Sequence, residues 1–148
     1  MEELSFLIEE FWKWTGLPRK KWGQFDIAGL PVDVTTFPRL GEVCDACIRC
    51  INKSLSREEM ELFLVGLAMD AENADILEAC KDRASGTFVS HMLCAGVSHP
   101  QSEARWQLTE LLRKEIPQRE HYLHILLADP DAYVRKRAGN VIHEQPLL

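Results

Sequence analysis

Apolar residues recur along most of the chain at the three- and four-residue spacing of amphipathic helices. The clearest case lies near the end of the sequence, where one helical face collects Val134, Ala138, Val141 and Ile142. Asp129 is expected to cap this helix and Pro130 to occupy its first position, because proline needs no amide partner there. The pattern predicts a helix over residues 130–143.

The same pattern returns thirty residues earlier in the chain. A shift of thirty superposes Pro100 on Pro130 and gives a second apolar stripe, which consists of Ala104, Leu108, Leu111 and Leu112. The segments before these helices align at the same period, as shown by the matched set Leu62, Met92 and Tyr122. An internal repeat of two helices, each unable to bury its apolar face alone, is typical of an α-solenoid.

The rest of the pattern predicts an all-α chain. A first apolar stripe indicates a helix over 2–14, and a second one indicates a helix over 41–53. Residues 16–41 between them hold four glycines, three prolines and no helical period, which predicts a long ordered loop. A capping box of Ser56 and Glu59 marks the first clear repeat. The following helices are predicted over 57–69, 73–83, 86–98, 100–115, 117–128 and 130–143.

The last predicted helix opens with the run Asp129-Pro130-Asp131-x-x-Val134-Arg135-x-x-Ala138. This run resembles the start of the second helix in HEAT-like repeats, and the resemblance extends over about residues 57–143. It implies a HEAT-like α-solenoid of about three helix pairs, preceded by an N-terminal capping helix and the long ordered loop. We therefore expect one domain over 1–148, in which 1–56 form the N-terminal cap, the loop and one helix, and 57–143 form the helical repeats.

The composition is that of an ordinary globular protein, with 46% hydrophobic and 27% charged residues. No run of eighteen apolar residues exists, and the first residues are acidic, so neither a membrane span nor a signal peptide is expected. The five cysteines are odd in number, and three of them fall at Cys44, Cys47 and Cys50 on one predicted helix. That arrangement cannot form an ordinary disulfide framework, which favours free thiols and a cytoplasmic location.

The cysteine triplet is also the most evident candidate for a metal site. Three cysteines on one regular helix spread around its circumference, so they converge poorly on an ion, and we expect them to be small core residues. His121 and His124 share a helical face, but no third ligand stands at motif spacing. Nucleophile elbows and phosphate-binding loops are absent from the sequence. The sequence thus predicts no catalytic residue, no metal and no cofactor, and the protein is not expected to be an enzyme.

The formal net charge of −6 is concentrated in one segment, because residues 54–82 carry eight acids and two bases. A focused negative field favours a basic partner and disfavours nucleic acid, whose phosphates need positive charge. Part of this excess is explained equally well without a partner, as the solvated first turn of a helix that carries Glu58, Glu59 and Glu61. The acids predicted to face a partner are Asp70, Glu72, Asp75, Glu78 and Asp82.

Four further residues are candidates for partner contact. In a solenoid the second helix of each pair commonly lines the ligand-binding face, which places Arg105 and Trp106 there. Trp106 is either an interface anchor or a core residue. Trp22 and Phe25, in the predicted loop, either anchor an interface or pack over the first helices.

These features predict a non-catalytic module that binds one protein partner and neither nucleic acid nor a membrane. A small, acidic, HEAT-like binder resembles the immunity proteins of bacterial toxin systems in size, charge and scaffold. That resemblance implies an inhibitor whose acidic surface neutralises a cognate basic, nuclease-like toxin domain. Two alternatives remain open at this point: a HEAT-like enzyme or enzyme subunit of the lyase or DNA-glycosylase type, and a structural adaptor with a broad apolar face.

Overall fold

The computed structural model describes residues 1–144, and over this range the chain is all-α. It contains eight α-helices, no strand, and four short 3₁₀ helices within these residues. The α-helices are α1 (Glu2–Thr15), α2 (Leu40–Cys50), α3 (Arg57–Met69), α4 (Asp75–Arg83), α5 (Gly86–Gly96), α6 (Ser102–Leu108), α7 (Arg119–Leu127) and α8 (Ala132–Glu144). No helix in the described range is long and apolar enough to cross a membrane. The all-α prediction is confirmed.

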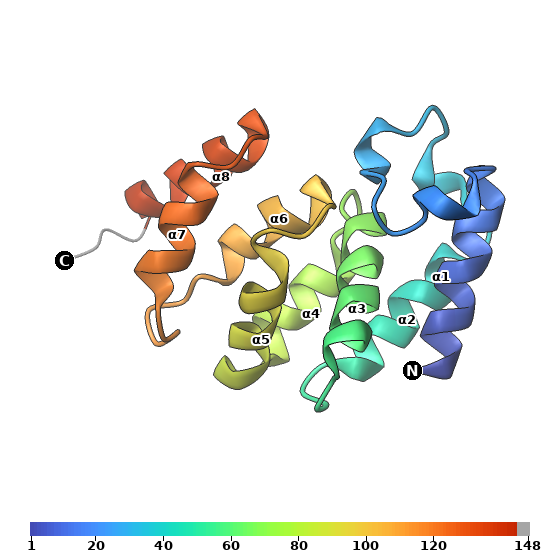
Figure 1. Ribbon diagram of the computed structural model, residues 1–148. Coiled ribbons are helices and arrows are strands. Elements are labelled where there is room, and N and C mark those ends of the chain that lie inside the picture. Colours follow the sequence, from blue (N-terminus) through green and yellow to red (C-terminus); the bar gives the residue numbers. More distant parts are fainter. Residues whose placement is uncertain (145–148) are drawn as a thin grey trace.

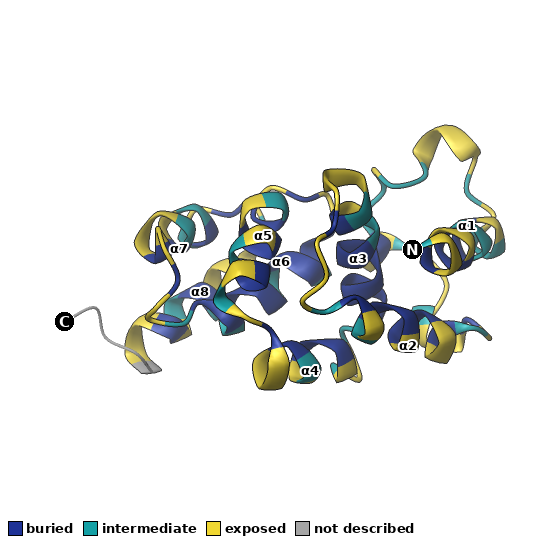
Figure 2. Cartoon of the chain, turned by 90° about the horizontal axis from the view of Figure 1, so that it is seen from below, coloured by how far each residue is buried: buried dark blue, intermediate teal, exposed yellow. Residues whose placement is uncertain are grey.

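The helices form two layers (Figures 1 and 2). In one layer α1 packs on α3 and α3 on α5, and α7 continues the row; in the other layer α2 packs on α4 and α6 on α8. Successive helices pack across the layers, with α1 on α2, α2 on α3, α5 on α6 and α7 on α8. The array therefore runs from α1 at one end to the α7–α8 pair at the other (Figure 1).

The core lies between the two layers, where the predicted apolar stripes meet. All four residues of the stripe that begins at Ala104 are buried, as are Val134, Ala138 and Val141 of α8. Ile142 was predicted to be buried but is 40% exposed, and it lies in the last turn of α8, the last described helix. Gly96 of α5 lies so close to α6 that a Cβ there would clash with the buried Leu108.

Four predicted helix starts, those of α4, α6, α7 and α8, were wrong by two residues, although the capping box of Ser56 and Glu59 is confirmed. Helices α6, α7 and α8 begin two residues after the prolines that were placed at their first positions, Pro100, Pro117 and Pro130. Asp131, not Asp129, caps α8, because its Oδ1 accepts the amides of Tyr133 and Val134. The carboxylate of Asp129 is engaged in an ion pair instead.

Helix α6 is also shorter than predicted. The apolar pattern continues to Leu112, but the α-helix ends at Leu108 and a 3₁₀ turn, η4 (Thr109–Leu111), follows. Both helix types keep the leucines on the core side, so the pattern alone did not reveal the change. The 3₁₀ turn η4, which follows the early end of α6, contacts both α4 and α8 and so packs within the layer of even-numbered helices.

The segment between α1 and α2 is the long ordered loop that the sequence predicted. It contains three 3₁₀ turns, η1 (Arg19–Lys21), η2 (Ile27–Gly29) and η3 (Val34–Thr36). Asp26 and Asp33 cap the second and third turns through their side chains. Ile27 and Phe37 are buried in the core, which fixes the loop on the helices.

Candidate functional site

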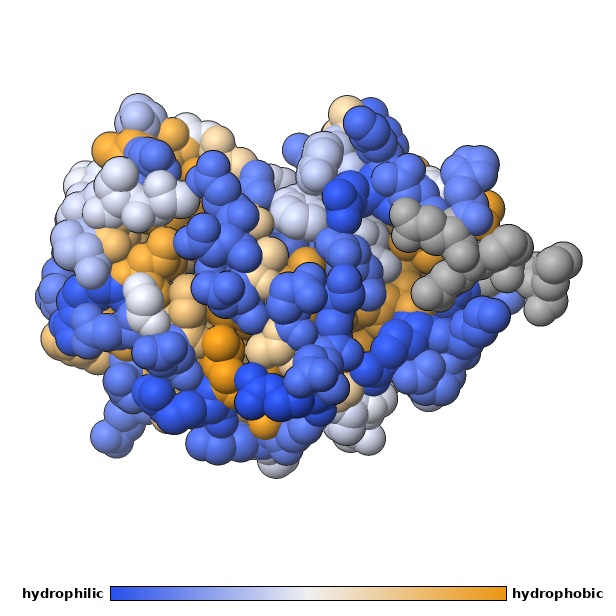
Figure 3. Space-filling model, turned by 180° about the vertical axis from the view of Figure 1, so that it is seen from behind, coloured by the Kyte–Doolittle hydropathy of each residue, from blue (hydrophilic) through white to orange (hydrophobic). Residues whose placement is uncertain are grey.

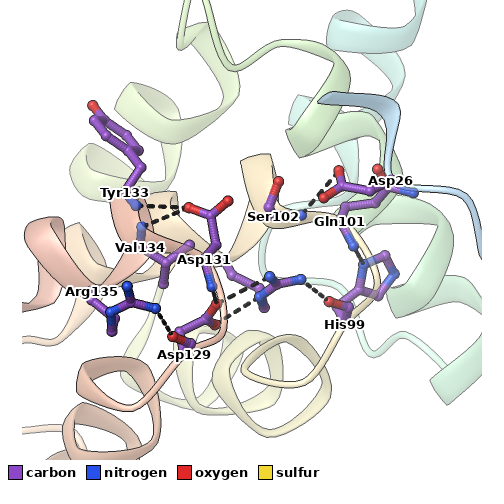
Figure 4. A network of polar contacts seen from close by, with 10 residues as sticks. Asp26, His99, Gln101, Ser102, Asp129, Asp131, Tyr133, Val134 and Arg135 are labelled. Atoms are coloured by element: carbon purple, nitrogen blue, oxygen red, sulfur yellow. Dashed lines mark hydrogen bonds and ion pairs between the residues drawn. The ribbon is translucent and has the colours of Figure 1, made fainter. Parts of the chain in front are cut away.

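A network of buried polar contacts fixes the loop to the start of α6 (Figure 4). Gln101, which is fully buried, accepts the amide of Ile27 through Oε1 at 2.8 Å and donates Nε2 to the carbonyl of Phe25 at 2.6 Å. The amide of Ser102 donates to Asp26 Oδ1 at 3.3 Å. Because buried backbone groups need partners, this one side chain accounts for the position of the middle of the loop.

The same network continues to α8 through an ion pair. Arg105 Nε lies 2.8 Å from Asp129 Oδ2 and Nη2 lies 3.1 Å from Oδ1, a bidentate arrangement, while Nη1 donates to the carbonyl of His99 at 2.7 Å. The side chains are 11% and 2% exposed. Asp129 also accepts the amide of Asp131, and its carbonyl accepts Arg135 Nη1. The ion pair thus ties α6 to the turn before α8.

His99 completes the network as a neutral side chain. Its Nδ1 accepts the amide of Gln101 at 3.2 Å, which requires a ring nitrogen without a proton. Burial, and secondly the charge of Arg105, lowers the pKa of His99 to about 4. The imidazole therefore stays uncharged at neutral pH and serves the structure of the turn before α6.

These contacts shape a groove at one edge of the helix array, which we call the edge groove. Its volume is about 320 Å³, and it lies between the loop, the end of α3 and the start of α6. Figure 3 shows the molecule hollowed at its upper edge, between the raised ends formed by the loop and by the α7–α8 pair. The floor is apolar and the lining residues include Leu30, Val32, Val34, Ala68 and Met69.

The charged residues that line the edge groove are all acidic: Asp33, Glu72 and Glu103. Hydrogen bonds from Thr35 lower the pKa of Asp33. Glu103 accepts Trp106 Nε1 at 2.9 Å, so it is held in place at the groove. Glu72 is exposed and forms no ion pair with the residues described. The groove therefore combines an apolar floor with negative charge.

The acidic surface continues from the groove onto α4. Asp75, Glu78 and Asp82 are exposed there, as predicted for a partner-binding surface. Lys81 lies 3.5 Å from Glu78, whereas Asp75 and Asp82 have no ion-pair partner within residues 1–143. Four of the five predicted acids, Glu72 among them, are thus accessible to another molecule.

Asp70 was predicted to face a partner, and this prediction was wrong. The residue is 1% exposed, and its Oδ2 accepts the amide of Ile76 at 2.8 Å at the start of α4. Burial raises the pKa of Asp70, while hydrogen bonds from Ile76 and Cys44 lower it. Its carboxyl group holds the first turn of α4, a role that the sequence spacing did not reveal because helix α4 begins later than predicted.

Arg105 was also predicted to contact a partner, and its burial in the ion pair contradicts this. Trp106 is half-buried; its ring packs edge-to-face on Tyr133 at 5.6 Å and lies under Arg137 at 4.9 Å. The ring therefore packs partly against the core and stays partly accessible, and its role as an interface anchor remains a prediction.

Trp22 and Phe25 are half-buried and lie outside the lining of the edge groove. Trp22 donates Nε1 to the carbonyl of Leu17 at 2.9 Å, and Arg19 lies 5.0 Å from its ring. It lines a separate, wider hollow of about 520 Å³ beside α1 and α3. Packing against the core explains the partial burial of the Trp22 side chain, and the hydrogen bond from Gln101 fixes the backbone of Phe25.

Four of the five cysteines contribute to the core. Cys44, Cys47, Cys50 and Cys80 are buried with free thiols, and Cys94 is exposed. Burial raises the pKa of Cys44 and of Cys80 to about 12. Within the described part of the chain, no group of three or more His, Cys, Asp or Glu side chains is placed to hold a metal ion.

Sequence reasoning missed most residues of the edge groove. Gln101 and His99 organise it, and Val32, Asp33 and Glu103 line it, but none of them carried a local signal. The only available signal was that the loop is too apolar to be a free tail. Comparison with protein families, with curated proteins and with solved structures finds no match to this chain.

Proposed function

We propose that this protein binds a basic segment of one partner protein at the edge groove and the adjoining acids of α4. The observation that carries the proposal is the lining of the groove, where apolar side chains form the floor and the three charged residues are all acids. A partner that inserts an apolar side chain there and flanks it with lysine or arginine would gain both burial and charge pairing. Among the four exposed large apolar side chains of the described residues, Val32 belongs to this groove.

The proposal includes a HEAT-like α-solenoid of about three helix pairs as the scaffold. Support comes from the thirty-residue period and from the succession of helices in two layers. In such a scaffold each helix contacts its neighbours, so an edge formed by several units presents one extended surface to a partner.

A basic nuclease domain of a toxin is the class of partner that this surface fits best. A nuclease carries positive charge where it binds nucleic acid, and an acidic protein that covers that charge would block the substrate. Opposite charges would also steer the two proteins together, so association would be fast and would weaken with salt. We therefore propose an immunity-type inhibitor as the function.

An adaptor with a broad apolar face fits less well. The exposed large apolar side chains in the described range lie on separate elements, in α1, the loop and α8: Phe6, Val32, Tyr133 and Ile142. Scattered apolar residues of this kind are usual on a protein surface.

The test compares two triple charge reversals that change the net charge equally. The first is Glu72→Lys, Asp75→Lys and Asp82→Lys at the proposed surface; the control is Glu2→Lys, Glu58→Lys and Glu120→Lys, which are exposed acids on other helices. Each protein is immobilised and exposed to lysate of the source cell at low and at high salt, and the retained proteins are identified and their affinities measured.

We expect one basic protein to be retained by the unchanged chain and by the control, and lost from the first variant and at high salt. Equal retention by both triple variants would show that the acidic edge is not the interface. Retention of no basic protein by the unchanged chain would refute the proposed function.

A further inference from the structure

A second hollow lies on the layer of even-numbered helices, apart from the edge groove. Its volume is about 260 Å³, and α4, the segment around η4, and α8 contribute its lining. It forms where α6 ends early, since η4 contacts both α4 and α8 and the chain then turns toward α7. The residues that line it differ from those of the acidic edge groove.

The lining of this hollow is cationic, in contrast to the acidic chain around it. Lys81 comes from α4, Arg113 from the segment after η4, and Arg137 from α8. Glu110 is the one acid among the lining residues. Lys81 and Arg113 each also pair with an acid outside this lining, Glu78 at 3.5 Å and Glu115 at 2.8 Å, so the positive excess holds only for the residues that line the hollow.

Two of these cations are held in fixed positions. Glu110 accepts Lys81 Nζ at 3.3 Å through Oε1 and Arg137 Nη2 at 2.8 Å through Oε2. The guanidinium of Arg137 also lies 4.9 Å from the ring of Trp106. The carboxylate of Glu110 thus orients two cations. Side chains that are already held in position lose less conformational freedom when an anion binds to them.

Arg113 supplies a third donor group at the hollow. Its Nε is buried and makes no hydrogen bond, although Glu115 Oε1 lies 2.8 Å away as an ion-pair partner. The side chains of Lys81, Arg113 and Arg137 are 40%, 28% and 29% exposed, so a ligand can reach them. Asn140 and Thr109 add polar groups to the lining.

We propose that this hollow binds a small anion that carries a phosphate group. The lining offers three cationic side chains to a ligand, and arginine and lysine are the side chains that recognise phosphate. The volume of the hollow, about 260 Å³, is slightly below the range of about 300–1,000 Å³ typical of pockets for drug-sized ligands, so the hollow suits a smaller molecule. Glu78 and Asp82 stand on α4 next to Lys81, and their charge disfavours an extended polyanion such as nucleic acid.

The test uses inorganic phosphate as the probe and the full chain as the protein. Binding is measured by isothermal titration and by the shift of the thermal unfolding midpoint, with sodium chloride at equal ionic strength as the reference. Glycerol 2-phosphate is titrated in parallel, which separates a site for free phosphate from a site for a phosphate monoester, and acetate serves as the monoanion.

Two isosteric variants provide the matched comparison. Asn140→Asp places a carboxylate in the hollow without changing the shape of the side chain, whereas Asn73→Asp makes the same change at an exposed position before α4. We expect Asn140→Asp to weaken phosphate binding by about tenfold or more and Asn73→Asp to leave it within about twofold. Lys81→Gln should also weaken it, and circular dichroism verifies that each variant is folded.

The expected result is saturable binding of phosphate or of its monoester to the unchanged chain, tighter than binding of acetate. The proposal is overturned if neither phosphate compound acts differently from chloride at equal ionic strength. It is also overturned if Asn73→Asp weakens binding as much as Asn140→Asp, because the effect would then come from the total charge of the chain.

Discussion

Asp129→Asn removes one negative charge from the buried ion pair with Arg105 while it keeps the shape of the side chain. Arg105 then retains its positive charge at 11% side-chain exposure, with the carbonyl of His99 as its remaining strong acceptor. Breaking one partner of a buried pair costs about 3–5 kcal/mol. We expect a loss of about 3 kcal/mol in the free energy of unfolding, at the low end, because the asparagine oxygen still accepts a hydrogen bond.

A double-mutant cycle measures how much of this loss belongs to the pair. Arg105→Met alone leaves the carboxylate of Asp129 at 2% side-chain exposure without its cation, and we expect it to cost about 4 kcal/mol. When both changes are combined, no unpaired charge remains in the site, so the double variant should lose less than the sum of the single variants. The expected coupling energy is about 2 kcal/mol or more.

The assay is urea unfolding at pH 7, followed by far-UV circular dichroism, for the three variants and one control. The control is Asp131→Asn, which changes an acid two residues away but keeps a good N-cap for α8, and it should cost less than about 0.5 kcal/mol. A loss below about 1 kcal/mol for Asp129→Asn, or additive single variants, would refute the reasoning that this ion pair holds α6 to the turn before α8.

Four further predictions concern single residues. The pKa of His99 is lowered from 6.5 to about 4 in the folded chain, so as the pH falls through this range the unfolded chain binds a proton that the folded chain does not. The free energy of unfolding should therefore drop by about 2 kcal/mol between pH 7 and pH 5. Urea titrations at both pH values measure this drop, and His99→Asn should make it smaller. A thiol reagent should modify Cys94 rapidly in the native protein and all five cysteines only in denaturant; rapid native modification of a second thiol would contradict the burial of the other four. Gly96→Ala should lower the urea midpoint by an amount equivalent to about 1–3 kcal/mol, because its Cβ meets the buried Leu108, whereas the exposed Gly41 offers open space for the same change as a control. Asp70→Asn should leave the affinity for the captured partner and its salt dependence unchanged, since the residue is buried; a weaker complex would show that Asp70 takes part after all.

The helices could be predicted from the sequence because their signal is local. The bounds of α3 match the prediction at both ends, since the capping box fixes its start and the apolar stripe runs through it. The loop between α1 and α2 was also found, because glycines and prolines interrupt the helical spacing there. The end of α6 was missed because the leucines continue past the point where the hydrogen bonding changes.

The candidate site was much harder to predict, since its contacts join distant parts of the chain. Arg105 was expected at the surface, but its carboxylate partner lies 24 residues further along the sequence, and no spacing rule links the two. Asp70 was counted with the accessible acids of α4, although it serves the backbone of that helix. The edge groove joins the loop, the end of α3 and the start of α6, so only the folded chain reveals that Glu72 and Val32 share one surface.

The bonds between Gln101 and the loop affect how the chain folds. Most helices of the array contact neighbours that are near in sequence, but these bonds join residues 74 and 76 positions apart. During synthesis the loop cannot complete its hydrogen bonds until residue 101 has been made, which is after about two thirds of the 148 residues. Once formed, the bonds make the two parts a single cooperative unit, and amides from α1 to α6 should exchange with solvent together rather than helix by helix from the N-terminal end.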